Sequence, residues 1–168
     1  MEYSLCTISI AEVRTTYHND LQLLPCQNDA PYRMQSHIAC LPWDDLRDYI
    51  PFLDHLGVVP EMAEGGKSRI SLVIKPEFEN SFHIAHGGVV MTLLDFAMGA
   101  AARSTIDQPL GAMTIDMSVS FLRPSVGKIV VEGSVLKSGK TINYCEAVVL
   151  NEAGEVTAKS SGTFMLRR

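Results

Sequence analysis

Basic residues are few in this 168-residue sequence. There are 14 Lys and Arg residues against 19 Asp and Glu residues, which gives a formal net charge of −5 at pH 7. No cluster of basic residues stands out along the chain. Because nucleic-acid binding needs concentrated Lys and Arg opposite the phosphates, this composition argues against nucleic acid as the main partner.

The sequence also has no closely paired cysteines. Its 4 Cys residues form no C-x-x-C motif, so neither a zinc site nor a thioredoxin-like redox motif is indicated. His83 and His86 are three residues apart without further ligands nearby, which makes a poor metal site. We expect no metal and no organic cofactor, and we expect free thiols in a reducing cytosol at Cys6, Cys26, Cys40 and Cys145.

A run of apolar residues long enough to cross a membrane is missing. The apolar stretch Val89–Ala102 is interrupted by Asp95 and is shorter than the roughly 20 residues that a bilayer requires. The N-terminus has an acidic residue at position 2 and no basic region followed by an apolar one, so it does not resemble a secretory signal. We therefore expect a soluble, cytoplasmic protein without a membrane partner.

The residues that are present indicate one folded domain. Apolar residues make up 46% of the chain and charged residues 20%, which is ordinary for a globular protein. Residues 1–42 show no sustained hydrophobic period, and three prolines interrupt them. We predict an N-terminal extension over residues 1–42 and a single domain over residues 43–168.

The domain is predicted to begin with a helix and a hairpin. Residues 43–57 favour a helix with acidic residues in its first turn, a kink or division at Pro51 and a stop at Gly57. Two strands should follow, joined by a tight turn at Gly65 and Gly66, which can both adopt positive φ.

A long apolar helix and four strands are predicted next. The last three of these strands, within residues 128–166, form a meander with turns at residues 137–140 and 151–154. The first strand lies within residues 114–124, and its apolar residues alternate with polar ones, as in a half-buried strand: Ile115, Met117, Val119 and Phe121.

This order predicts an α+β fold. An antiparallel six-stranded sheet can wrap around one long central helix and bury it on most of its circumference. Such burial explains why the helix is apolar all round instead of having a single apolar stripe.

One carboxylate, Asp95, lies in the middle of this apolar helix. An ionised carboxylate in an apolar interior is costly unless it is paired or hydrogen-bonded, and no Lys or Arg stands three or four residues from Asp95. Asp95 therefore either points outward at a gap in the sheet, pairs with a distant group such as Arg103 or Arg123, or serves in catalysis.

The residues before the helix favour the catalytic alternative. His86, Gly87 and Gly88 should form its first turn, where backbone N–H groups are unpaired and the helix dipole is positive. This arrangement suits an oxyanion or a polarised carbonyl, and Gly87 would let a ligand approach the backbone closely. A bare His-Gly-Gly is a weak signal, but its fixed distance from a lone helical carboxylate is a stronger one.

Helix geometry separates the two features within one chain. Gly87 and Asp95 are eight residues apart, which is roughly 12 Å along a helix axis and too far to hold one carbonyl carbon. Two such helices, antiparallel about a twofold axis, would bring Gly87 of one subunit near Asp95 of the other. We therefore predict a homodimer with two shared active sites.

The motif and the following strand resemble a known family. Asn80, then His86 with Gly87 and Gly88, then Asp95 within "LLDFA", are spaced as in the PaaI-type hotdog-fold acyl-CoA thioesterases. The resemblance extends over residues 43–168 and implies the hotdog fold, an acyl-CoA substrate and association of two dimers into a tetramer. His83 departs from the pattern, because relatives often carry glycine there.

The resemblance also implies roles for individual residues. The Gly87 N–H would polarise the thioester carbonyl, and Asp95 of the opposite subunit would be either a general base or a nucleophile. Asn80 would help to hold the water or the thioester, and Thr114 would orient the water. His86 would fix the loop before the helix, and both His86 and Gly88 would contribute to substrate binding.

Further residues are candidates for binding the acyl-CoA. Phe82, Met91 and Met113 would line an acyl tunnel, although apolar residues are more often plain core. Arg123 and Lys140 would contact the CoA phosphates, although solvated surface charge is the commoner role of such residues. The sequence leaves open which acyl group is bound and whether an acyl carrier protein replaces CoA.

Two other functions fit the fold. A hotdog hydratase would need a different spacing of Asp and His, and no suitable His follows Asp95. A sensing module would bind acyl-CoA without hydrolysing it, but residues 1–42 contain only Arg14 and Arg33 as basic residues, too few for a DNA-binding segment. Hydrolysis of an acyl-CoA thioester is therefore the main prediction.

Overall fold

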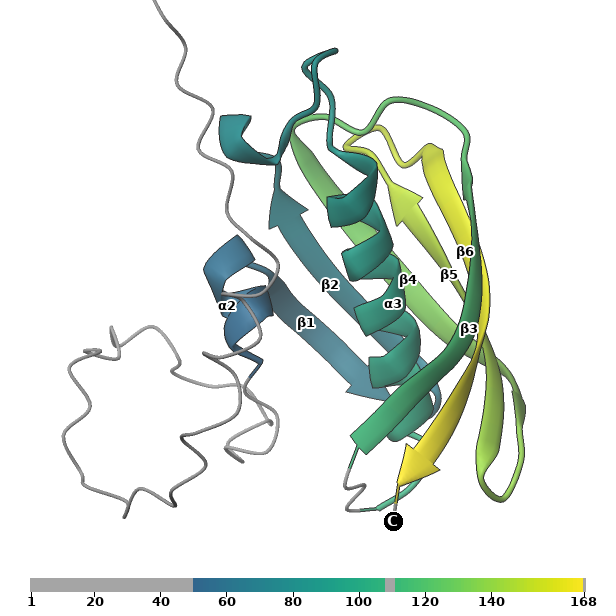
Figure 1. The fold of residues 1–168 in the computed structure, drawn as a ribbon. Coiled ribbons are helices and arrows are strands. Elements are labelled where there is room, and N and C mark those ends of the chain that lie inside the picture. Colours follow the sequence, from purple (N-terminus) through teal and green to yellow (C-terminus); the bar gives the residue numbers. More distant parts are fainter. Residues whose placement is uncertain (1–49, 108–110, 168) are drawn as a thin grey trace, which may run out of the picture. The chain divides into compact units, whose positions relative to one another are not determined.

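One antiparallel sheet of six strands forms the framework of the domain (Figure 1). The computed structural model describes residues 50–107 and 111–167, so the predicted extension over residues 1–42 and its boundary lie outside the described residues. The spatial order of the strands is β1-β2-β4-β5-β6-β3, which makes β1 and β3 the two edges. The strands are β1 (Val59–Glu64), β2 (Lys67–Val73), β3 (Gly111–Phe121), β4 (Lys128–Ser138), β5 (Ile142–Leu150) and β6 (Val156–Arg167).

The long helix α3 (Gly87–Arg103) packs against one face of this sheet (Figure 1). The core lies between the helix and the sheet, where Leu93, Leu94 and Met98 meet the inward side chains of the strands and are fully buried. The predicted α+β hotdog fold, a six-stranded antiparallel sheet with one central helix, is thereby confirmed.

The helix is not covered on all sides in the single chain. Residues that recur at helical spacing along one side of the helix are exposed or half-buried, and Met91 is 42% exposed. The apolar character of the helix is therefore not explained by the sheet alone, and the prediction of burial on most of its circumference was too strong for one protomer. The uncovered stripe consists of Gly88, Met91, Thr92, Asp95, Phe96, Gly99 and Arg103.

Backbone contacts fix the position of the helix on the sheet. A Cβ built on Gly133 of β4 would lie 2.5 Å from the Ala97 carbonyl oxygen, closer than real atoms approach. The Ser68 hydroxyl of β2 donates a hydrogen bond of 2.6 Å to the same oxygen. Only glycine at position 133 allows the strand to lie this close to the helix.

The remaining short elements follow the sequence signals. Helix α2 (Pro51–Leu56) has Pro51 in its first turn and ends at Gly57, whose φ of 78° confirms the predicted stop. Of the predicted helix before Pro51, only Ile50 lies within the described residues, and it is the N-cap of α2 with an extended backbone. The β1–β2 hairpin turns at Gly65 and Gly66 with φ of 56° and 79°, as predicted. A short 3₁₀ helix, η2 (Pro76–Phe78), precedes the loop that leads into α3.

Candidate active site

Asp95 lies on the uncovered stripe of α3 and has a polar partner on β3. The Thr114 hydroxyl donates a hydrogen bond of 2.6 Å to Asp95 Oδ1. Among the described residues, no cation forms an ion pair with Asp95. The carboxylate is thus tolerated in an apolar helix because it is half-buried at an opening and hydrogen-bonded, and the pairing with Arg103 or Arg123 considered from the sequence is not formed.

A β-bulge in β3 turns Thr114 toward the helix. Thr114 pairs with Phe164 and Asp116 pairs with Thr163, so Ile115 has no partner in the register. The sequence predicted that Ile115 shares a face with Met117, but the bulge places Thr114 there instead and leaves Ile115 57% exposed. Bulges of this kind often redirect a side chain beside an active site.

The first turn of α3 carries one free backbone donor. His86 is the N-cap: its Nδ1 accepts the Gly88 N–H at 3.0 Å, and its carbonyl oxygen accepts the Val89 N–H at 3.0 Å and the Val90 N–H at 3.3 Å. In the part of the chain that the structure describes, no acceptor is hydrogen-bonded to the Gly87 N–H. The positive end of the helix therefore presents a donor that is available to a carbonyl oxygen.

The loop before α3 is shaped by Asn80. Its Oδ1 accepts the Phe82 N–H at 2.8 Å, and its own N–H donates to the Ile84 carbonyl at 2.9 Å. His83 adopts a φ of 57°, and its Nδ1 lies 3.2 Å from Glu79 Oε2. A positive φ favours glycine, so His83 occupies a backbone conformation that suits the glycine expected from the resemblance.

The predicted site residues fall at two ends of the single protomer. The Gly87 end includes the loop that contains Asn80 and Phe82. It also includes the segment that follows β3, because the Ala85 N–H donates a hydrogen bond to the Ser125 carbonyl. Arg123 lies in that segment, and its Nη1 donates to the Val156 carbonyl at 2.8 Å.

The Asp95 end includes Thr114, Met113 and the turn that contains Lys140. Met113 pairs with Met165, and the Leu166 N–H donates to the Thr141 carbonyl, which brings this turn to the same end of the sheet. Phe82 is 80% exposed and Met113 is 48% exposed. In one protomer the predicted tunnel residues Phe82, Met91 and Met113 are thus exposed to solvent. The residues at the Gly87 end and those at the Asp95 end are not brought together.

Comparisons with known proteins identify the family. Residues 82–158 match the family model of the thioesterase superfamily. A "Putative esterase" of Halobacterium salinarum is 35% identical over 112 residues, which are 64% of this chain and 74% of that protein. The chain belongs to the thioesterase superfamily. Acyl-coenzyme A thioesterase 13 of Homo sapiens is 29% identical over 104 residues, which are 60% of this chain and 74% of that protein.

The superfamily match is consistent with the fold. The structure of the E. coli PaaI protein from the phenylacetic acid degradation operon aligns with a TM-score of 0.64 over 68% of this chain and 82% of that chain, at 21% identity. The predicted resemblance to PaaI-type hotdog proteins is thereby confirmed. The residues matched to the superfamily model include Gly87, Asp95 and Thr114.

Residues 50–107 and 111–167 contain no group of three His, Cys, Asp or Glu side chains placed to hold a metal ion. In the same ranges, none of the helices has the length and hydropathy to cross a membrane. Cys145 is a buried free thiol, and burial raises its pKa to about 11, so it stays protonated and poorly reactive at neutral pH.

Proposed function

We propose that the protein hydrolyses an acyl-CoA thioester to a free acid and CoA. The observation that carries this proposal is the carboxylate of Asp95, held by the Thr114 hydroxyl at an opening of an otherwise apolar helix. Membership of the thioesterase superfamily and the likeness to a human acyl-coenzyme A thioesterase support it. A thioester carbonyl is already electrophilic, so the proposed steps use only protein groups and water.

Asp95 acts on the carbonyl carbon in one of two ways. As a general base it removes a proton from water, whose oxygen adds to the carbonyl carbon before the C–S bond breaks and the CoA thiolate leaves. As a nucleophile its carboxylate displaces the thiolate, and water then hydrolyses the resulting anhydride. In both cases the Thr114 hydroxyl occupies Oδ1 and leaves the other carboxylate oxygen for the reaction.

The Gly87 N–H stabilises the negative charge that develops on the carbonyl oxygen. One such preorganised donor typically contributes about 10²-fold to 10³-fold in rate. Gly87 and Asp95 of one helix are roughly 12 Å apart along its axis, so the donor and the carboxylate of one site come from two subunits.

The free edge of β3 suits the interface between these subunits. β3 pairs with β6 on one side only, and its apolar side chains Met113 and Ile115 are 48% and 57% exposed. Antiparallel pairing of two β3 edges about a twofold axis places the Gly87 end of one protomer beside the Asp95 end of the other. Arg123 of one subunit and Lys140 of the other then flank each site as binding groups for the CoA phosphates, and two such dimers form the tetramer.

The first test measures hydrolysis of a panel of acyl-CoA thioesters by wild type, Asp95→Asn and Thr114→Val. We expect Asp95→Asn to lower kcat by about 10²-fold or more while acyl-CoA binding persists, because the variant keeps the shape of the side chain and loses its basicity. Thr114→Val should lower kcat by roughly 10-fold, and Thr114→Ser should restore it.

Asp116→Asn is the matched control, because this exposed carboxylate lies on the same strand and points away from Asp95. Full turnover in Asp95→Asn would disprove the mechanism. Wild-type protein that binds acyl-CoA without any turnover would show a binding module instead of a hydrolase.

A further inference from the structure

The ring of Phe121 lies beside Gly87, the residue whose N–H has no acceptor among the described residues. Phe121 is the last residue of β3 and pairs with Ala158, a buried residue that faces the helix, so its side chain points to the helix side of the sheet. A Cβ built on Gly87 would lie 3.4 Å from Phe121 Cζ and 3.7 Å from Cε1. Gly87 thus leaves a gap about one methyl group wide between the helix N-terminus and an aromatic ring.

This ring is unusually open to solvent for a large apolar group that faces the helix. Phe121 is 55% exposed, and Phe82 and Val126 in neighbouring segments are 80% and 51% exposed. The hydrogen bond of 2.9 Å between the Ala85 N–H and the Ser125 carbonyl ties these segments together around the first turn of α3. An exposed apolar surface beside an unpaired backbone donor is the usual composition of a ligand site, with one polar group to orient the ligand and apolar groups to contact it.

We propose that Phe121 is a specificity-determining residue, whose ring packs against the acyl carbons next to the carbonyl that Gly87 polarises. This inference rests on the proposed thioesterase function and adds the substrate class. The ring offers no hydrogen-bonding group, so it favours contact with a continuous hydrocarbon. The acyl side of the thioester can supply one, whereas the CoA side has a polar amide only a few atoms from the sulfur. The preferred substrates therefore carry an apolar acyl group of several carbons, straight-chain or aromatic, and acetyl-CoA and acyl groups with polar substituents near the carbonyl are poor substrates.

The test compares kcat/KM for acetyl-, butyryl-, hexanoyl-, octanoyl- and phenylacetyl-CoA in wild type, Phe121→Ala and Phe121→Leu. We expect wild type to prefer the longer and aromatic groups. Phe121→Ala should lower the ratio of hexanoyl to acetyl turnover by roughly 10-fold, and Phe121→Leu should retain part of the preference.

Phe52→Ala provides the matched control. Phe52 is also 55% exposed but lies on α2, next to the opposite edge of the sheet, so the same substitution there should leave the acyl preference unchanged. Phe121→Leu keeps the test valid if Phe121→Ala does not fold.

Each contrary result has its own meaning. An unchanged acyl profile in an active Phe121→Ala or Phe121→Leu variant overturns this inference and leaves the thioesterase proposal intact. An equal loss on every substrate, acetyl-CoA included, also overturns it, because the ring would then contact the part common to all of them. A wild type without turnover on any substrate overturns both proposals.

Discussion

Two adjacent glycines in the first turn of α3 have different surroundings. A Cβ on Gly87 would make ordinary contact with Phe121 at 3.4 Å, and its backbone φ lies outside the left-handed region. The fold itself therefore tolerates alanine at position 87, and in the proposed mechanism the absence of a side chain there leaves room for the ligand. We predict that Gly87→Ala keeps or raises the free energy of unfolding, by up to about 1 kcal/mol, and lowers kcat/KM by roughly 10²-fold. Urea unfolding and thioester hydrolysis measure the two effects.

Gly88 is the matched comparison. Its Cβ would lie 3.1 Å from His86 Nδ1, the atom that accepts the Gly88 N–H and caps the helix. Gly88→Ala should therefore disturb the cap and lower the free energy of unfolding by about 0.5–2 kcal/mol. If Gly87→Ala were instead the less stable of the two variants, the space beside Gly87 would serve packing and not substrate.

The sequence predicts some residues of this site better than others. Asp95 is conspicuous because a carboxylate in an apolar helix is costly, and the glycines mark the helix start. The contact of Thr114 with Asp95 depends on a bulge at Ile115, which alternation of apolar and polar residues does not reveal. The approach of Phe121 to Gly87 joins residues 34 positions apart and follows only from how β3 lies along α3.

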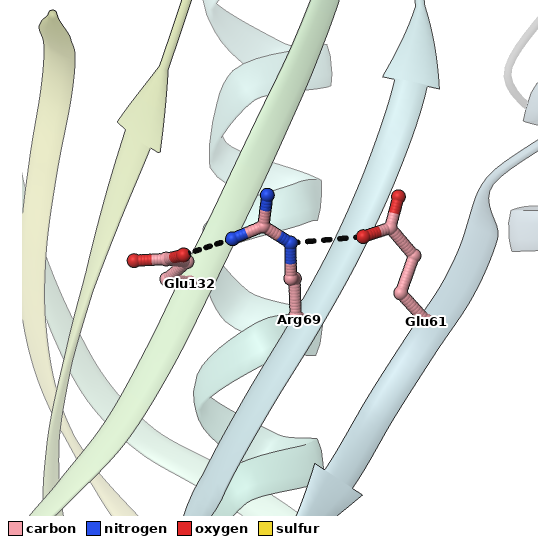
Figure 2. Close-up of polar contacts among 3 residues, drawn as sticks. All are labelled: Glu61, Arg69 and Glu132. Atoms are coloured by element: carbon pink, nitrogen blue, oxygen red, sulfur yellow. Dashed lines mark hydrogen bonds and ion pairs between the residues drawn. The ribbon is translucent and has the colours of Figure 1, made fainter. Parts of the chain in front are cut away.

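At the scale of elements, an ion-pair network joins three neighbouring strands on the sheet face away from the helix (Figure 2). Arg69 of β2 pairs with Glu61 of β1 at 2.9 Å and with Glu132 of β4. The pKa of the Glu61 carboxyl lies below its ordinary value of 4.5. The hydrogen bond with the Ser71 side chain is the largest cause, and the hydrogen bond and charge of Arg69 lower the pKa further. Since the folded state depresses this pKa, the stabilising contribution is present above pH 4.5 and is lost as pH falls through the folded value.

Glu61→Gln should therefore lower the free energy of unfolding at pH 7 by about 0.2–1 kcal/mol, the range of exposed ion pairs. The difference from wild type should shrink as pH is lowered below 4.5. Urea unfolding at fixed protein concentration, from pH 7 downward, measures it, with the exposed Glu77→Gln of η2 as the control. A difference that stays constant with pH would mean that the charge of Glu61 does not stabilise the edge of the sheet.

The sequence predicted the positions of the helices and strands better than it predicted which of their residues are buried. The hairpin at Gly65 and Gly66, the stop at Gly57 and the meander of strands follow from local turn chemistry and from hydrophobic period. The uncovered stripe of α3 could not be predicted from the sequence. A helix that is apolar on all sides shows that its residues suit a buried position, but not which part of the protein buries them. A helix that one protomer's sheet covers on one side has the same composition as a helix buried by a sheet and a partner.

For the whole molecule, a shared active site predicts complementation between two inactive variants. A dimer of one Asp95→Ala subunit and one Gly87→Ala subunit has one site with both substitutions and one site with neither. Random exchange makes half of the dimers mixed, and each has one intact site of two, so an equimolar mixture should recover about one quarter of wild-type activity. The measurement is thioester hydrolysis after the two purified variants exchange subunits.

Each variant exchanged with itself is the control and should remain at its own low activity. If Gly87 and Asp95 of one site came from the same subunit, each site of the mixed dimer would contain one substitution and the mixture would recover nothing. The roughly 12 Å between the two residues along α3 makes that result incompatible with a single carbonyl held by both. Failure to complement in dimers shown to be mixed would therefore remove Gly87 or Asp95 from the mechanism, and the single-variant rates would show which one.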